Sequence, residues 1–153
     1  MKPNILEIEA QIQIQKPVHT VFEAITDPAK MSNYFISYGS GYMEEDKHLI
    51  WRFPEFDEDV PIHTGKIEKD QYISFHWIVE DKDMLVEITL SSSGNDSTIV
   101  HIAEKSMENN EAGIQWLKGN TEGWANFLAC LKAYLEYGIN LRKGAFDFMR
   151  DNE

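Results

Sequence analysis

The chain has few of the residues that would place it in an oxidising compartment or in a membrane. Its 153 residues include a single cysteine, Cys130, so no internal disulfide can form, and we expect a cytoplasmic protein in which Cys130 is a packing thiol. No apolar run reaches the ~20 residues that a membrane-spanning helix needs. Glu7 and Glu9 interrupt the first apolar segment, which argues against a secretory signal. We therefore predict a soluble protein without membrane insertion.

Positive charge is also scarce. The chain has 14 Lys and Arg residues against 26 Asp and Glu residues, a formal net charge of −12 at pH 7. Phosphate backbones would be repelled at long range, so we predict no nucleic-acid partner. Acids gather at residues 44–46 and 55–59, but neither group has the spacing of a calcium loop. We interpret both groups as solvated loops and predict no metal and no cofactor.

The first third of the sequence predicts a strand and two short helices. Apolar and polar residues alternate strictly over residues 6–15, which is typical of a half-buried strand. Pro17 suits the first turn of a helix that ends near Asp27, and Asp27 can cap a second helix running to about Tyr34.

The middle of the chain predicts an antiparallel meander. Polar turns at residues 45–47, 69–71 and 93–95 separate several of its strand patterns. The predicted strands are residues 37–43, 48–53, 62–69, 72–79, 85–91 and 98–105. Without a repeat or a linker, residues 1–153 are expected to form a single domain.

The last element is expected to be one long amphipathic helix within residues 110–141. Its apolar residues share one side of a helix: Leu117, Trp124, Leu128, Leu131, Leu135 and Ile139. Two starts are possible, Asn110 and Asn120, and the spacing favours Asn110, which places Gly119 and Gly123 inside the helix. Gly144 is the expected C-terminal cap. Such a stripe must be buried against the sheet.

Several phrases of the sequence resemble a known family. Residues 22–28 (FEAITDP), residues 65–67 (GKI) leading into residues 73–77 (ISFHW), and Gly123-Trp124 followed by Phe127, Leu128 and Leu131 are similar to the START-like (SRPBCC) superfamily. Within it they resemble proteins related to the activator of heat-shock protein 90 ATPase. The resemblance implies an α+β helix-grip fold: a curved seven-stranded antiparallel sheet around a long C-terminal helix, in the order β-α-α-β6-α.

The resemblance also implies partners. In eukaryotic co-chaperones of that name this domain follows a separate N-terminal domain, for which 153 residues leave no room. ATPase activation is therefore not carried over, although a chaperone contact stays a hypothesis, with the protein a monomer or weak homodimer.

A sheet that grips a helix can enclose a ligand cavity, and the sequence offers large apolar residues to line it. The same side chains could instead simply fill the core. The predicted ligand-binding residues are Tyr34, Trp51, Phe53, His63, Phe75, Trp77, Ile88, Trp124, Phe127, Leu128 and Leu131.

Three functions are compatible with these residues. The favoured one is a non-enzymatic domain that shelters a small apolar or amphipathic molecule in a closed pocket of several hundred cubic ångströms, as ligand sites commonly have. The second is an interaction module of co-chaperone type that uses the exterior. The third is a cyclase-like enzyme, which needs polar side chains such as His63, His101 and Tyr42 to converge inside. No catalytic signature is present, so no catalytic residue is assigned.

Overall fold

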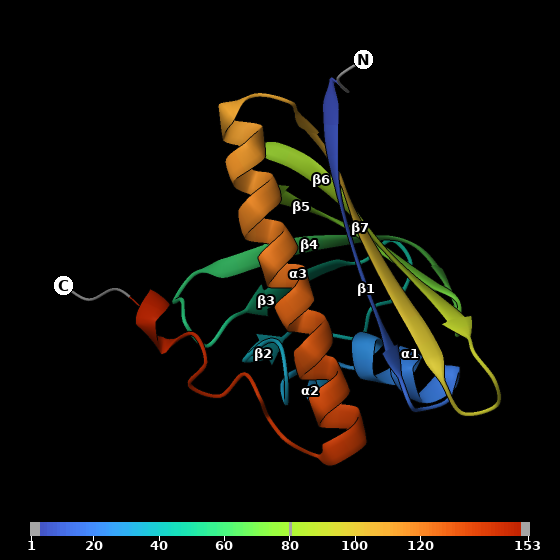
Figure 1. Ribbon diagram of the computed structural model, residues 1–153. Helices are drawn as coiled ribbons and strands as arrows, with labels where there is room; N and C mark the ends of the chain where they lie inside the picture. The colour runs from blue at the N-terminus through green and yellow to red at the C-terminus, as the bar shows by residue number, and fades with distance from the viewer. Residues whose placement is uncertain (1–3, 80, 151–153) are drawn as a thin grey trace.

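The computed structural model describes residues 4–79 and 81–150, in which one antiparallel sheet is crossed by a long helix (Figure 1). The sheet order is β1-β7-β6-β5-β4-β3-β2. The strands are β1 Ile5–Ile14, β2 Tyr38–Gly39, β3 His48–Arg52, β4 Asp59–Glu68, β5 Tyr72–Val79, β6 Lys82–Ser92 and β7 Thr98–Glu108. The helices are α1 Val18–Thr26, α2 Pro28–Met31, α3 Glu111–Tyr137 and the short 3₁₀ helix η1 Asp147–Met149. The α+β helix-grip fold is confirmed.

The predicted turns contain backbone that only a few residue types adopt easily. Asp46, Asp70 and Gly94 have φ of 54°, 61° and 73°, one in each predicted turn. Asp and Gly enter this left-handed region more readily than other residues. The local sequence therefore fixes where the meander reverses.

Two short elements differ from expectation. The strand predicted over residues 37–43 is reduced to Tyr38–Gly39, because the chain then leaves the sheet and the Met43 N–H donates to the Thr26 carbonyl, 3.0 Å away. The helix capped by Asp27 ends at Met31 rather than near Tyr34.

Helix α3 begins where the spacing favours and ends earlier than expected. The Asn110 side chain accepts from the Gly113 N–H at 2.8 Å, so the longer of the two predicted helices is confirmed. Gly138, with φ of 66°, ends the helix, and its N–H donates to the Tyr134 carbonyl. The prediction that Gly144 caps the helix is wrong, since this left-handed cap lies six residues earlier. Ile139 consequently lies outside the helix and is exposed.

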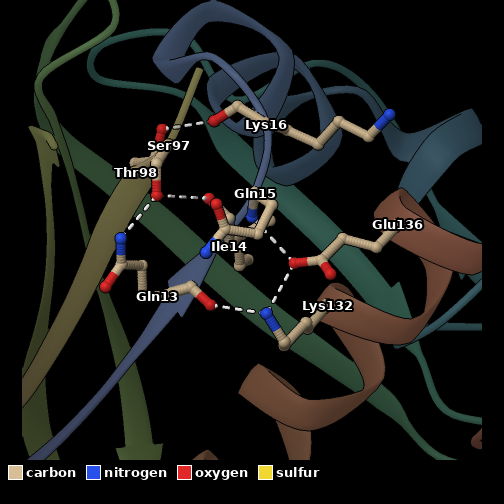
Figure 2. A network of polar contacts seen from close by, with 8 residues as sticks. All are labelled: Gln13, Ile14, Gln15, Lys16, Ser97, Thr98, Lys132 and Glu136. Carbon is tan, nitrogen blue, oxygen red and sulfur yellow. Dashed lines mark hydrogen bonds and ion pairs between the residues drawn. The ribbon is translucent and has the colours of Figure 1, made fainter. Parts of the chain in front are cut away.

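Polar contacts fix the C-terminal half of α3 to the end of β1 (Figure 2). Lys132 Nζ donates to the Gln13 carbonyl at 2.8 Å and pairs with Glu136 at 2.6 Å, while the Gln15 N–H donates to Glu136 at 2.7 Å. Burial raises the pKa of Glu136, but the hydrogen bonds from Gln15 and Lys132 outweigh it, so the pKa lies below its ordinary value. The helix is thus held in one position along the sheet.

The hydrophobic core lies between the sheet and α3. The inward residues of β1 include Ile8 and Ile14, which are buried, and Trp124 and Leu131 of α3 are buried opposite the sheet. After α3 the chain turns back toward the β3 and β4 side of the sheet (Figure 1). None of the helices in the described part of the chain is long and apolar enough to cross a membrane.

Candidate functional site

The space between the sheet and α3 is filled by side chains. It has no volume that a water molecule could occupy, and its lining consists of Ile25, Met31, Phe35, Met43, Trp51, Phe75, Ile88, Trp124 and Phe127. Aromatic rings account for this dense packing, with centroids 4.7 Å apart for Phe35 and Phe127 and 5.2 Å apart for Trp51 and Phe75. The expectation of a closed cavity of several hundred cubic ångströms is therefore corrected: these residues pack against one another.

An open groove of about 370 Å³ lies where α3 meets the ends of β4 and β5. Its lining is mostly apolar, with Asn120 and Arg142 as the polar side chains: Phe35, Phe53, Phe56, Val60, Trp77, Ile78, Val79, Asn120, Gly123, Trp124 and Arg142. Ligand sites in proteins commonly combine an apolar lining with a few placed polar groups. The groove is thus the candidate site.

Two tryptophans form the inner part of the groove. Trp77 alternates with the inward residue Phe75 on β5, and Trp124 comes from the buried side of α3; their rings lie 5.6 Å apart. Beside Trp124, a Cβ added to Gly123 would meet no heavy atom within 4 Å. The glycine therefore leaves the helix side of the groove open at some cost, since glycine within a helix is about 1 kcal/mol less favourable than alanine.

Glu104 lies behind the tryptophans and is fully buried, with 0% of its surface exposed. Its Oε2 accepts from Trp77 Nε1 at 2.9 Å, and its Oε1 accepts from Trp124 Nε1 at 2.9 Å and from Asn120 Nδ2 at 3.1 Å. All three partners are N–H donors, whereas a protonated carboxyl group would need an acceptor for its own O–H. Both carboxyl oxygens of Glu104 thus accept hydrogen bonds, the pattern that suits a carboxylate.

No ion pair among residues 4–79 and 81–150 includes Glu104. Sequence reasoning missed this residue, although a signal was available. Glu104 falls in phase with Val100 and Ile102 on β7, which are both buried. A charged residue at an inward position of a strand indicates a special site, because an unpaired buried charge is costly.

Arg142 closes one edge of the groove. Its Nη2 lies 2.7 Å from Glu55 Oε1, and the two side chains are 15% and 2% exposed. The guanidinium carbon lies 5.8, 5.6 and 4.9 Å from the ring centroids of Phe35, Phe53 and Phe146, within cation–π range. The expectation that residues 55–59 form a solvated loop is thus wrong for Glu55. Its ion pair with Arg142 holds the segment after α3 against the groove.

The predicted lining residues divide between two places. Trp51, Phe75, Ile88 and Phe127 line the packed interior, Phe53 and Trp77 line the groove, and Trp124 lines both. Phe35, which the prediction did not include, also lines both. Leu128 and Leu131 belong to the buried core.

The predicted polar and thiol residues are less accessible than a ligand contact requires. Tyr34 is buried and its hydroxyl donates to the Ala24 carbonyl at 2.8 Å; burial, with the nearby Tyr134, raises the Tyr34 pKa well above its ordinary value. Burial likewise raises the pKa of the Cys130 thiol. Both side chains act as packing groups.

His63 lies on the other face of the sheet and is corrected as a cavity residue. It follows the inward Ile62 on β4, so alternation turns it outward, where its ring stacks on His48 with centroids 4.0 Å apart. His63 Nε2 lies 2.8 Å from Asp46, and the hydrogen bond and charge of His63 lower the Asp46 pKa. His76 is its neighbour on β5, so three histidines form a row across the sheet.

The other polar candidates are also outside. His101 lies 2.9 Å from Glu9 on the outer face, and the exposed Tyr42 donates to Asp27. His63, His101 and Tyr42 therefore do not converge. Within the described residues, no group of three or more His, Cys, Asp or Glu side chains is arranged to hold a metal ion.

Most of the chain matches the model of one known protein family. A family model described as "Activator of Hsp90 ATPase homolog 1-like protein" matches residues 15–136. The chain belongs to this family. Membership confirms the resemblance of residues 22–28 and 65–77, which lie within the match. Among curated proteins, no sequence matches significantly.

Solved structures of other proteins share the family's fold. Protein SSP2350 from Staphylococcus saprophyticus is 32% identical, with a TM-score of 0.79 over 90% of this chain and 96% of that one. The Aha1 dimer from Colwellia psychrerythraea is 17% identical, with a TM-score of 0.74 over 87% and 98%. The di-domain ARO/CYC BexL from the BE-7585A biosynthetic pathway is 15% identical, with a TM-score of 0.74 over 86% of this chain and 46% of that one. The last two show the fold alone.

Proposed function

We propose that this domain binds a small apolar or amphipathic molecule in the open groove beside Trp77 and Trp124. The observation that carries the proposal is the groove itself, about 370 Å³ in volume and lined by aromatic side chains. Sites for small molecules typically measure about 300–1,000 Å³. The ligand would bind at the mouth of the helix grip, because the interior behind Phe35 is packed.

The walls of the groove are held before any ligand arrives. Each indole N–H is bound to Glu104, so neither ring has to find a new hydrogen-bond partner when a molecule docks on it. Preorganised walls lower the entropy lost on binding. Gly123 supports the same function, because a larger residue would occupy the space it leaves.

Binding can be tested with the neutral fluorescent probe N-phenyl-1-naphthylamine and with ¹⁵N-labelled protein. The chain has four tryptophans. Trp77 and Trp124 line the groove, so their indole N–H signals report on ligand binding there, whereas Trp116 does not line it and serves as an internal reference. We expect saturable fluorescence enhancement with shifts at Trp77 and Trp124. The result against the proposal is an unchanged indole spectrum at saturating probe.

Gly123→Leu fills the groove and should weaken probe binding at least tenfold while the protein stays folded. Ala125→Leu is the matched control, because Ala125 is exposed on α3 and does not line the groove. Equal binding by both variants would place the probe elsewhere.

An outer-face interaction is the second candidate. A hollow of about 760 Å³ on β3, β4 and β5 is lined by Ile50, Pro61, Ile78 and the histidine row, and Ile78 is 64% exposed. Apolar surface of this kind supports a protein contact, and the family description names the Hsp90 ATPase. Ile50→Asp, which leaves the groove intact, should abolish binding to purified heat-shock protein 90 if this face is used; unaltered binding would exclude the face.

A cyclase-like reaction has less support. The polar groove residues are Asn120 and Arg142, of which Arg142 is paired with Glu55. The carboxylate of Glu104 is sealed behind the indoles.

A further inference from the structure

We propose that the groove selects amphipathic cations, meaning molecules with an apolar body and an ammonium group, over neutral and anionic molecules of the same shape. This inference rests on the proposed ligand-binding function of the groove. It concerns the charge of the ligand, which the apolar lining does not determine.

The first step is the charge balance around the groove. The Glu104 carboxylate is fully buried and bound to three neutral donors. Hydrogen bonds from neutral groups stabilise a buried charge without cancelling it, and an unpaired buried carboxylate is costly. A positive charge brought near Trp77 and Trp124 would offset this charge.

The second step concerns Arg142, the other charged residue at the groove. Its guanidinium is paired with Glu55 at 2.7 Å, so these two charges cancel. Glu104, behind the two indoles, is left as the acidic side chain that has no ion-pair partner among the described residues. Arg142 also shows that rings of this groove accept a cation, since its guanidinium lies over Phe35 and Phe53.

The third step concerns the indole rings. The faces of aromatic rings attract cations, and tryptophan does so most strongly. Trp77 and Trp124 both donate their N–H groups to a carboxylate, and hydrogen bonds polarise the groups that they join. Electron density on both rings therefore rises, which strengthens their attraction for an ammonium group in the groove. The carboxylate acts through the indoles, so Glu104 is a positioning residue.

The experiment compares three ligands with the same eight-carbon chain: octyltrimethylammonium, 1-octanol and octanoate. Each is titrated into the ¹⁵N-labelled protein while the indole signals are followed. We expect the ammonium compound to bind about tenfold more tightly than the alcohol, as a cation–π contact of ordinary strength gives. Octanoate should bind most weakly.

Salt and two variants identify the source of the preference. The chain's net charge of −12 would favour any cation at low salt, but 0.5 M NaCl screens surface charges far more than buried ones. The preference should therefore persist in salt. Glu104→Gln should reduce the ratio of ammonium to alcohol affinity by about tenfold. Glu87→Gln removes the same charge from the outer face, where Glu87 pairs with Lys105, and should leave the ratio unchanged.

The outcomes separate this inference from the proposed function. If 1-octanol and N-phenyl-1-naphthylamine bind at Trp77 and Trp124 but the ammonium compound has no advantage in 0.5 M NaCl, the cation inference is overturned and the groove function stands. An advantage that survives Glu104→Gln also overturns it. If no compound shifts either indole, the proposed function fails with it. Should Glu104→Gln not fold, the wild-type comparison in salt still decides the matter.

Discussion

The buried pair between Arg142 and Glu55 should contribute measurably to stability, and its removal is a sharp test of the structure. Arg142→Ala would leave the Glu55 carboxylate, 2% exposed, without its partner. Breaking a buried ion pair from one side typically costs about 3–5 kcal/mol. Here Arg142 itself is 15% exposed and lies on a terminal segment, so water can reach Glu55 once the segment lifts. We therefore expect a loss of about 2–4 kcal/mol.

A double-mutant cycle isolates the pair from the packing of Arg142 on the phenylalanines. Urea unfolding of wild type, Arg142→Ala, Glu55→Ala and the double variant should give a coupling free energy of about 1–3 kcal/mol. For a domain of this size, a loss of about 3 kcal/mol lowers Tm by roughly 6–12 °C. Strictly additive losses, or a loss below about 0.5 kcal/mol for Arg142→Ala, would refute the assignment of a buried, energetically coupled pair.

Three further predictions concern stability. Gly119→Ala should raise the unfolding free energy by about 1 kcal/mol, because alanine favours the helix over glycine and the added methyl meets no atom within 4 Å. Gly113→Ala should lower the unfolding free energy, because its Cβ would lie 1.9 Å from the Glu108 carbonyl oxygen. Leu131→Ala, at a position with 0% exposure, should cost about 2–5 kcal/mol in urea unfolding, and a loss under 1 kcal/mol would contradict its place in the core. Because the folded-state pKa of Glu136 is lowered, its contribution is full above its unfolded pKa and is lost as the pH falls through the folded pKa. Urea midpoints should therefore fall less on acidification in Glu136→Gln than in wild type, and identical pH profiles would contradict this.

The fold was predictable because its elements carry regular patterns. Strict alternation over β1 and the helical spacing around Trp124 and Leu131 each identify one buried face, and turn residues such as Asp46 and Asp70 mark the reversals. The end of α3 was not predictable from spacing alone. Ile139 continues the apolar period, but Gly138 adopts the left-handed cap and ends the helix before it.

The candidate site was predictable only as a set of residue types. Several expected residues do line the groove or the interior, but whether rings enclose a cavity or fill it depends on fractions of an ångström in packing, which no sequence pattern encodes. His63 was misplaced because its strand positions were not assigned to a face. Arg142 and Glu55 lie 87 residues apart in sequence, so their contact arises only from the tertiary fold.

The rings of Phe35 and Trp124 line both the surface groove and the packed interior and stand between them. The depth available to a guest molecule is consequently set by two aromatic side chains. A smaller residue at either position would deepen the groove toward the core, so a chain of this architecture can acquire a deeper binding site through one substitution, with every strand and helix left in place.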